Sequence, residues 1–223
     1  MRSAARRVLL AGGSGLIGRE LLARLLADPR CTELHALLRR RPADWPEHPK
    51  LRTQIVDFAV LPALPPLDDA YIALGSTIKQ AGSEAAFRAV DFDAVLAVAR
   101  AARAAGMRRL MVVSALGADA GSRVFYNRVK GEAEQALQAL GFERLVLARP
   151  SLLLGDRAAL GQPIRRLEHL AATVLKPLLR VVPGAVRPIA AADVAAALHA
   201  AAWVKAPGLR VLESSAMQAA ARE

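Results

Sequence analysis

A tyrosine and a lysine four residues apart form a candidate pair for proton transfer. Tyr126 and Lys130 fall within residues 124–140, whose pattern predicts a helix, so this spacing places both side chains on one helix face. An ammonium group near a phenol lowers the phenol's pKa, which is ordinarily about 10. Such a pair can exchange a proton with a substrate oxygen whose charge changes during a reaction.

Ser114 supplies a hydroxyl group immediately upstream of this pair. It ends residues 109–114, which are predicted to form a strand, and it therefore lies at the carboxyl edge of a sheet, where ligands of such sheets bind. A serine in this place also suits a turn or a helix cap. The order of strand, serine, short loop and helix favours the chemical interpretation, in which Ser114 donates a hydrogen bond to the substrate oxygen.

A glycine-rich segment near the start of the chain predicts a phosphate-binding turn. It lies between an apolar run at 7–11 and leucines at helical spacing in 19–27, and its glycines fit both G-x-G-x-x-G and G-x-x-G-x-x-G. Glycine allows a tight turn, a close approach to a pyrophosphate and close packing of helix on strand. The helix N-terminus then attracts phosphate. The residues predicted to bind a dinucleotide here are Gly12, Gly13, Ser14, Gly15, Leu16, Ile17 and Gly18.

Arginines stand where dinucleotide-binding proteins often carry an acidic residue. Arg39 and Arg40 follow the predicted second strand, 33–38, about 20 residues beyond the glycines. A guanidinium group pairs with a ribose 2′-phosphate, whereas a carboxylate would repel it. These two residues therefore predict NADP(H) as the cofactor in preference to NAD(H).

Alternating strand and helix patterns continue along most of the chain and predict the fold class. We expect an α/β, Rossmann-type, doubly wound and mostly parallel sheet with helices on both faces. The chain is predicted to be a single domain, residues 1–223, in which residues after about 150 form a small substrate-side cap. The predicted strands are 7–11, 33–38, 51–56, 70–74, 109–114, 144–148 and 209–212, and the predicted helices are 19–27, 83–105, 124–140, 163–179 and 191–204.

Composition excludes several classes of protein. The single cysteine, Cys31, rules out an internal disulfide, which is compatible with a reducing interior, and a cytoplasmic location is expected. No apolar run reaches 18 residues, so no transmembrane segment is expected. The dispersed His and Cys residues predict no metal site. The net charge of +11 comes from scattered arginines and aromatic residues make up only 4%, so nucleic acid is not the expected partner.

Taken together, these segments resemble the atypical NAD(P)-binding short-chain dehydrogenases/reductases, similar to the Tat-interacting oxidoreductase family. The resemblance covers residues 8 to about 155 and is weaker beyond. It rests on the ordered set of motifs, since no single motif is specific. The matching stretches are 12–18, 39–40, 56–58, 74–77, 113–119, 126–132 and 149–150.

The resemblance implies a role for each matching position. Asp57 and Phe58 are expected near the adenine, and Leu74, Gly75 and Ser76 under the ribose and pyrophosphate. Ser114, Tyr126 and Lys130 are expected to be the catalytic set, with Lys130 also holding ribose hydroxyls, while Arg149 and Pro150 flank the nicotinamide. In one departure from the family pattern, the asparagine that completes a catalytic tetrad in many members has no clear counterpart.

The sequence therefore favours an NADP-dependent oxidoreductase acting on a small carbonyl or hydroxyl substrate. Two alternatives remain open at this point: an NADPH-binding regulatory or scaffold protein with little turnover, and an enzyme like the nucleotide-sugar epimerases. A homodimer also remains open, because Arg165 and Arg166 precede an apolar stretch that could touch a second copy or a membrane surface, although we expect this stretch to cover the substrate cleft or pack on the core.

Overall fold

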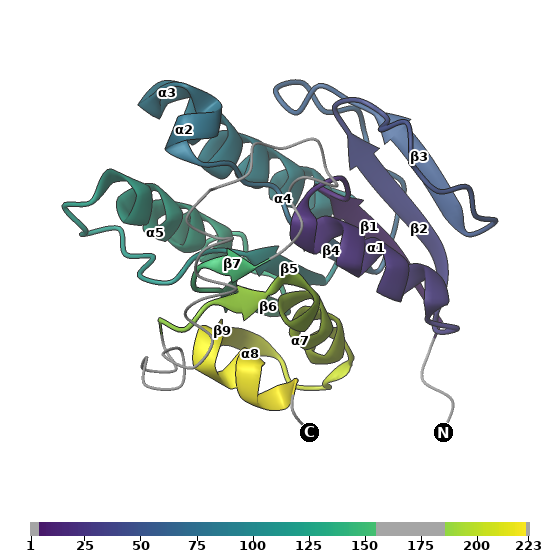
Figure 1. Cartoon of the computed structure of the whole chain (residues 1–223). Coiled ribbons are helices and arrows are strands. Elements are labelled where there is room, and N and C mark those ends of the chain that lie inside the picture. The colour runs from purple at the N-terminus through teal and green to yellow at the C-terminus, as the bar shows by residue number, and fades with distance from the viewer. Residues whose placement is uncertain (1–4, 155–185, 222–223) are drawn as a thin grey trace.

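A seven-stranded sheet is the centre of the computed structural model, which describes residues 5–154 and 186–221. Its strand order is β3-β2-β1-β4-β5-β6-β9, and every neighbouring pair is parallel (Figure 1). This confirms the Rossmann-type, doubly wound architecture. The strands are β1 (Arg6–Ala11), β2 (Cys31–Leu38), β3 (Leu51–Ile55), β4 (Asp69–Ile72), β5 (Arg109–Val113), β6 (Arg144–Arg149) and β9 (Gly208–Glu213).

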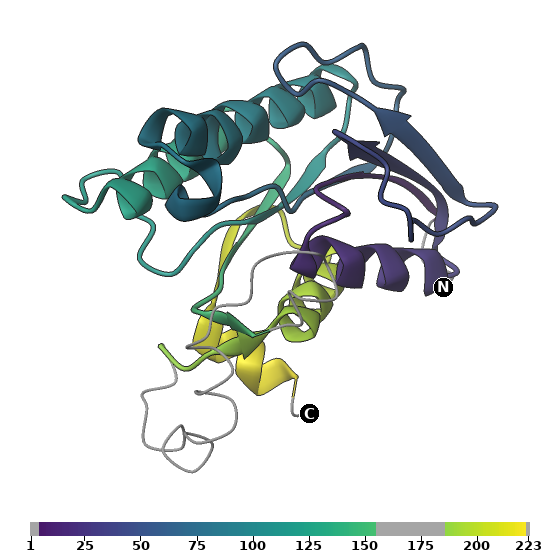
Figure 2. The same ribbon diagram turned by 45° about the horizontal axis from the view of Figure 1, so that its top comes forward.

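Helices cover both faces of this sheet. On one face lie α1 (Leu16–Ala27), α7 (Ala191–Trp203) and α8 (Ser214–Ala220), and on the other lie α4 (Val95–Ala104) and α5 (Phe125–Gln138) (Figure 2). With both faces covered, the central strands can be apolar throughout, and four successive residues of β1, from Val8 to Ala11, are buried.

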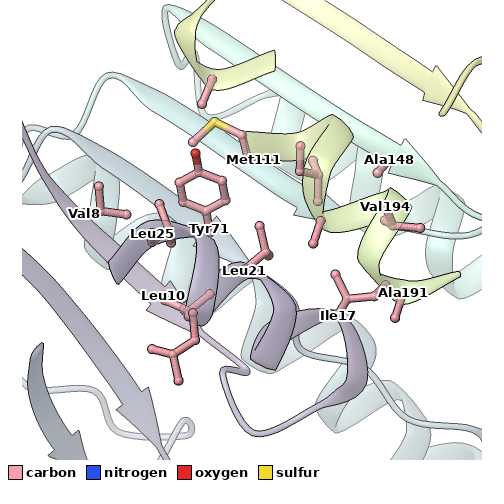
Figure 3. Close-up of a cluster of buried hydrophobic side chains, with 14 of the residues drawn as sticks. Val8, Leu10, Ile17, Leu21, Leu25, Tyr71, Met111, Ala148, Ala191 and Val194 are labelled. Atoms are coloured by element: carbon pink, nitrogen blue, oxygen red, sulfur yellow. The ribbon is translucent and has the colours of Figure 1, made fainter. Parts of the chain in front are cut away.

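The core on the first face joins α1 and α7 to the sheet. Leu21 from α1 and Val194 from α7 belong to one buried cluster with the strand residues Leu10, Tyr71 and Met111 (Figure 3). Both helix residues are fully buried. The packing of α1 against α7 and the sheet thus holds the start of α1 beside the glycine-rich turn after β1.

The region predicted as one helix, 83–105, contains an irregular turn. After α2 (Ile78–Ala81) it consists of α3 (Glu84–Arg88), a π-helical segment η1 (Ala89–Ala94) and then α4. The Ser83 hydroxyl accepts a hydrogen bond from the backbone N–H of Ala86 and so caps α3. Single π-helical turns are often found at functional sites, and this one directs Asp91 toward the interior, as described below.

Part of the predicted cap belongs to the main sheet. β9 pairs with β6 as the seventh strand, and α7 packs against α1. The short strands β7 (Leu153–Leu154) and β8 (Ile189–Ala190) form a separate two-stranded pair, which the sequence did not predict, and neither was α8 foreseen. The predicted helix 163–179 lies outside the described residues, as do Arg165 and Arg166.

Candidate functional site

A crevice of about 360 Å³ opens at the carboxyl edge of the sheet. It lies where the chain order reverses between β1 and β4, the place at which doubly wound folds bind ligands. Of the residues singled out from the sequence, those that line it are Gly15, Leu16, Ile17, Arg39, Leu74, Gly75, Ser76, Ser114, Tyr126, Lys130 and Pro150.

The turn between β1 and α1 needs glycine at two positions for packing. Gly12 has a φ of +88°, and a Cβ there would lie 2.5 Å from the carbonyl of Ala73. A Cβ on Gly18 would lie 1.9 Å from the carbonyl oxygen of Gly12, so Gly18 lets the helix approach the turn. Gly13 is pressed against the indole of Trp45. Gly12 and Gly18, the first and last glycines of the G-x-x-G-x-x-G pattern, are therefore required for packing.

Gly15 differs from those glycines because it faces the crevice. It is the N-cap residue of α1, where no side chain accepts a hydrogen bond and no acidic residue occupies the first turn. A Cβ on Gly15 would make only an ordinary contact, 3.5 Å from the Gly12 oxygen. The first N–H groups of the helix are thus available to a phosphate, which fits the pyrophosphate of a dinucleotide.

The arginines after β2 are exposed, and they differ in position. Arg39 lines the crevice, whereas Arg40 does not. The neighbouring Arg41 forms an exposed ion pair with Glu47, with 3.4 Å between the charged atoms. Arg39 forms no ion pair with any described residue, and its guanidinium group is available to an anion at the crevice.

Asp57 and Phe58, expected near an adenine, do not line the crevice. The Asp57 carboxylate accepts a hydrogen bond from the backbone N–H of Ala59 and shapes the turn after β3. The Phe58 side chain is buried in the core under α4, packed with apolar side chains of the sheet. The ring of Phe58 therefore serves packing in this structure.

Tyr126 and Lys130 lie in the first two turns of α5, and both line the crevice. Tyr126 is half-buried, and its ring packs 5.3 Å from that of Phe87, measured between ring centroids. Lys130 is only 5% exposed. The helix thus holds the phenol at the crevice and the ammonium group behind it.

A buried carboxylate, Asp91, accompanies Lys130. From the sequence, Asp91 is interpreted as a solvated helix position that could approach the cofactor, and it is not among the predicted site residues. In the structure Asp91 is 1% exposed, and its Oδ1 lies 2.7 Å from Lys130 Nζ. Burial disfavours the ammonium form, but the charge and hydrogen bond of Asp91, with smaller effects of Tyr126 and Glu134, outweigh it and raise the pKa of Lys130.

A second buried carboxylate, Glu134, lies one turn further along α5. The Ser114 hydroxyl donates a hydrogen bond to Glu134 Oε1 over 2.5 Å. Arg149 donates to both oxygens of the same carboxylate, over 3.0 and 2.5 Å, and also pairs with Glu213. The guanidinium group of Arg149 is thus engaged with acids and does not line the crevice, whereas Pro150 does.

Two features, a metal site and a membrane-spanning helix, are absent from the residues that the structure describes. Within residues 5–154 and 186–221, no three His, Cys, Asp or Glu side chains are grouped to hold a metal ion. Across the same ranges, no helix combines the length and apolar character needed to cross a membrane.

Comparison with known proteins assigns the family. A family model described as NAD(P)H-binding matches residues 12–202. The chain therefore belongs to the NAD(P)H-binding family, and its fold and relatives make it an atypical NAD(P)-binding short-chain dehydrogenase/reductase.

Two curated relatives illustrate the family. "Protein fmp52, mitochondrial" of Emericella nidulans is 38% identical over 158 residues, covering 67% of this chain and 68% of that protein. "Protein HTATIP2" of Rattus norvegicus is 35% identical over 158 residues, covering 68% of this chain and 64% of that protein. The expectation of a cytoplasmic location is wrong, because several relatives are named as mitochondrial. A single cysteine excludes a disulfide but does not distinguish one reducing compartment from another.

Solved structures with the same fold include one in complex with a nucleotide sugar and one named as a nucleotide-sugar epimerase. MoeE5 in complex with UDP-glucuronic acid and NAD has a TM-score of 0.71 at 22% identity, covering 92% of this chain and 75% of that one. A UDP-N-acetylglucosamine 4-epimerase from Methanobrevibacter ruminantium has a TM-score of 0.70 at 15% identity, covering 94% and 77%. At these identities the likeness shows the fold alone.

Proposed function

We propose that the protein is an NADPH-dependent oxidoreductase that transfers a hydride between the nicotinamide and a small carbonyl or hydroxyl substrate. The observation that carries this proposal is that Tyr126 lines the same crevice as the uncapped N-terminus of α1. Phosphate binding and proton transfer can therefore act on one bound cofactor and its substrate.

The cofactor would be held by groups along the crevice. Backbone N–H groups of residues 16 and 17, at the start of α1, bind the pyrophosphate, and Arg39 pairs with the 2′-phosphate. Leu74, Gly75 and Ser76 lie under the ribose, and the Lys130 ammonium group donates to its hydroxyls. When bound, the reduced nicotinamide supplies the hydride.

Tyr126 then acts as the general acid. As the carbonyl oxygen gains charge, the phenol donates its proton, and the ammonium group of Lys130 stabilises the resulting phenolate. Ser114 is a candidate hydrogen-bond donor to the same oxygen, which requires its hydroxyl to turn from Glu134 to the substrate.

A second function, NADPH binding with little turnover, is favoured by those carboxylate contacts. Ser114 gives its single hydroxyl proton to Glu134, and Lys130 is paired with Asp91. Both groups are already engaged before any substrate is present, so substrate must compete for them. An enzyme of the epimerase type has no comparable support, because it rests on likeness of fold.

Turnover of NADPH with a panel of aldehydes, ketones and quinones tests the proposal. Replacing Tyr126 with Phe removes the acid but keeps the ring on Phe87, so we expect turnover to fall about 100-fold or more while NADPH still binds. The measurement is NADPH absorbance at fixed protein concentration. Full turnover by Tyr126→Phe would overturn the assignment of Tyr126, and NADPH binding without turnover of any substrate would favour the second function.

A further inference from the structure

Asp91 connects two separate parts of the crevice through one buried carboxylate. Its Oδ1 lies 2.7 Å from Lys130 Nζ, and its Oδ2 accepts hydrogen bonds from the backbone N–H and the hydroxyl of Ser76, over 2.8 and 2.9 Å. Lys130 belongs to α5 and Ser76 to the loop after β4, and both line the crevice. The Asp91 side chain has no exposed surface.

Both oxygens of the carboxylate are engaged, since Oδ1 forms the ion pair with Lys130 and Oδ2 accepts the hydrogen bonds from Ser76. Lys130 and Ser76 both present donors, and they approach opposite oxygens of the carboxylate. An asparagine has the same shape but only one acceptor oxygen, so it can satisfy one side while its NH₂ group meets a donor on the other. The carboxylate is therefore specified by its contacts as well as by its charge.

We propose that Asp91 is a positioning residue that fixes the Lys130 ammonium group behind Tyr126 and, through the same carboxylate, ties the Ser76 loop to the catalytic helix. This role rests on the proposed function, in which Lys130 contacts the ribose of the cofactor and stabilises the Tyr126 phenolate, and Ser76 lies under the same ribose. Asp91 itself acts through these two residues and is not assigned contact with substrate.

The charge of Asp91 has a direct consequence for Lys130. The ionisable groups facing the ammonium group are Asp91 from η1 and Tyr126 and Glu134 from α5. A fully buried lysine without a counter-charge loses its proton easily. Since Asp91 is the leading favourable influence on the charged form, its carboxylate keeps Lys130 protonated at the pH at which Tyr126 must act.

Lysine titration followed by NMR tests the proposal without cofactor. The chain has five lysines, so the ¹³Cε signals of labelled protein can be resolved and that of Lys130 assigned from its loss in Lys130→Arg. We expect Lys130 of the wild-type protein to titrate above the exposed lysines, and Asp91→Asn to lower its midpoint by about one to three pH units. Asp93→Asn is the matched control, because Asp93 is exposed on the same π-helical segment.

Two results would overturn the proposal. One is a Lys130 midpoint in the wild-type protein below those of the exposed lysines, which decides the question even if Asp91→Asn does not fold. The other is an unchanged midpoint in folded Asp91→Asn. Neither titration midpoint depends on turnover. A wild-type protein that does not use NADPH would therefore contradict the proposed function without changing the measured effect of Asp91 on Lys130.

The pH profile of turnover connects the ion pair to catalysis. Losing the carboxylate makes Lys130 lose its proton at lower pH, and a neutral Lys130 no longer stabilises the phenolate that forms when Tyr126 gives up its proton. The alkaline limb of carbonyl reduction should therefore shift to lower pH. We expect that shift in Asp91→Asn and not in Asp93→Asn. If Asp91→Asn lowered turnover by the same factor at every pH and the alkaline limb did not shift, Asp91 would support only the fold.

Discussion

Two buried acids, Asp91 and Glu134, hold the polar groups Lys130 and Ser114 at the crevice, and the burial of neither acid was predicted from the sequence. The spacing of Tyr126 and Lys130 is a local helical signal and was therefore visible, and the structure places both at the crevice. The partners of Lys130 and Ser114 come from residues 39 and 20 positions away, through tertiary packing. A buried carboxylate looks like a solvated one in a sequence, because burial depends on elements that lie far apart along the chain.

At the scale of single residues, Arg39 should determine the choice of cofactor. Replacing it with Asp substitutes repulsion for an ion pair with the 2′-phosphate, so we expect NADPH affinity to fall about ten- to a hundredfold, with NADH affinity little changed. The measurement is a fluorescence titration of each cofactor.

Arg41→Asp provides the matched control for that charge reversal. Arg41 is also exposed and basic, but its ion pair is with Glu47 and it does not line the crevice. It should leave the ratio of NADPH to NADH affinity as in the wild-type protein. Equal affinities of the wild-type protein for the two cofactors would contradict the role given to Arg39.

Among the elements, the turn from β1 into α1 was the most predictable. Glycines at 12, 15 and 18 lie between an apolar run and a leucine-rich helix, and each requirement is local: a positive φ, an open helix end and close packing. The π-helical segment η1 was not predictable, because one extra residue in a turn leaves an alanine-rich helical pattern almost unchanged. The short α8 was missed for a similar reason, since its seven residues give little periodicity.

Two substitutions in this turn should separate folding from binding. Gly18→Ala places a Cβ 1.9 Å from the Gly12 oxygen, and relief of this overlap should cost about 1–3 kcal/mol of unfolding free energy. Gly15→Ala makes no close contact in the protein but adds a methyl group at a residue that lines the crevice, so it should weaken NADPH binding while lowering the melting temperature less than Gly18→Ala does. Thermal unfolding and cofactor titration of both variants check this.

The reverse outcome would be informative about that turn. If Gly15→Ala lowered the melting temperature as much as Gly18→Ala, the turn would be a packing feature only. If Gly15→Ala bound NADPH as tightly as the wild-type protein, the pyrophosphate would lie elsewhere than at the N-terminus of α1.

At the scale of the whole molecule, the fold could be predicted from the order of strand and helix patterns along the chain. Apolar runs at strand length alternate with helical patterns, and a parallel sheet covered on both faces is the arrangement that buries them. The substrate was not predictable, because specificity depends on loops and on residues brought together only by the fold. The excess of arginine is partly used in ion pairs with buried acids, since Arg6 pairs with Asp69 and Arg30 with Asp28.

Equilibrium binding of NADPH to the wild-type protein tests the central claim most directly. Trp45 packs against Gly13 of the phosphate-binding turn, so its emission should be quenched by a nicotinamide cofactor bound in the crevice. The account predicts a saturable titration, tighter for NADPH than for NADH and weakened in Gly15→Ala. The absence of saturable binding of either cofactor to folded wild-type protein would contradict it.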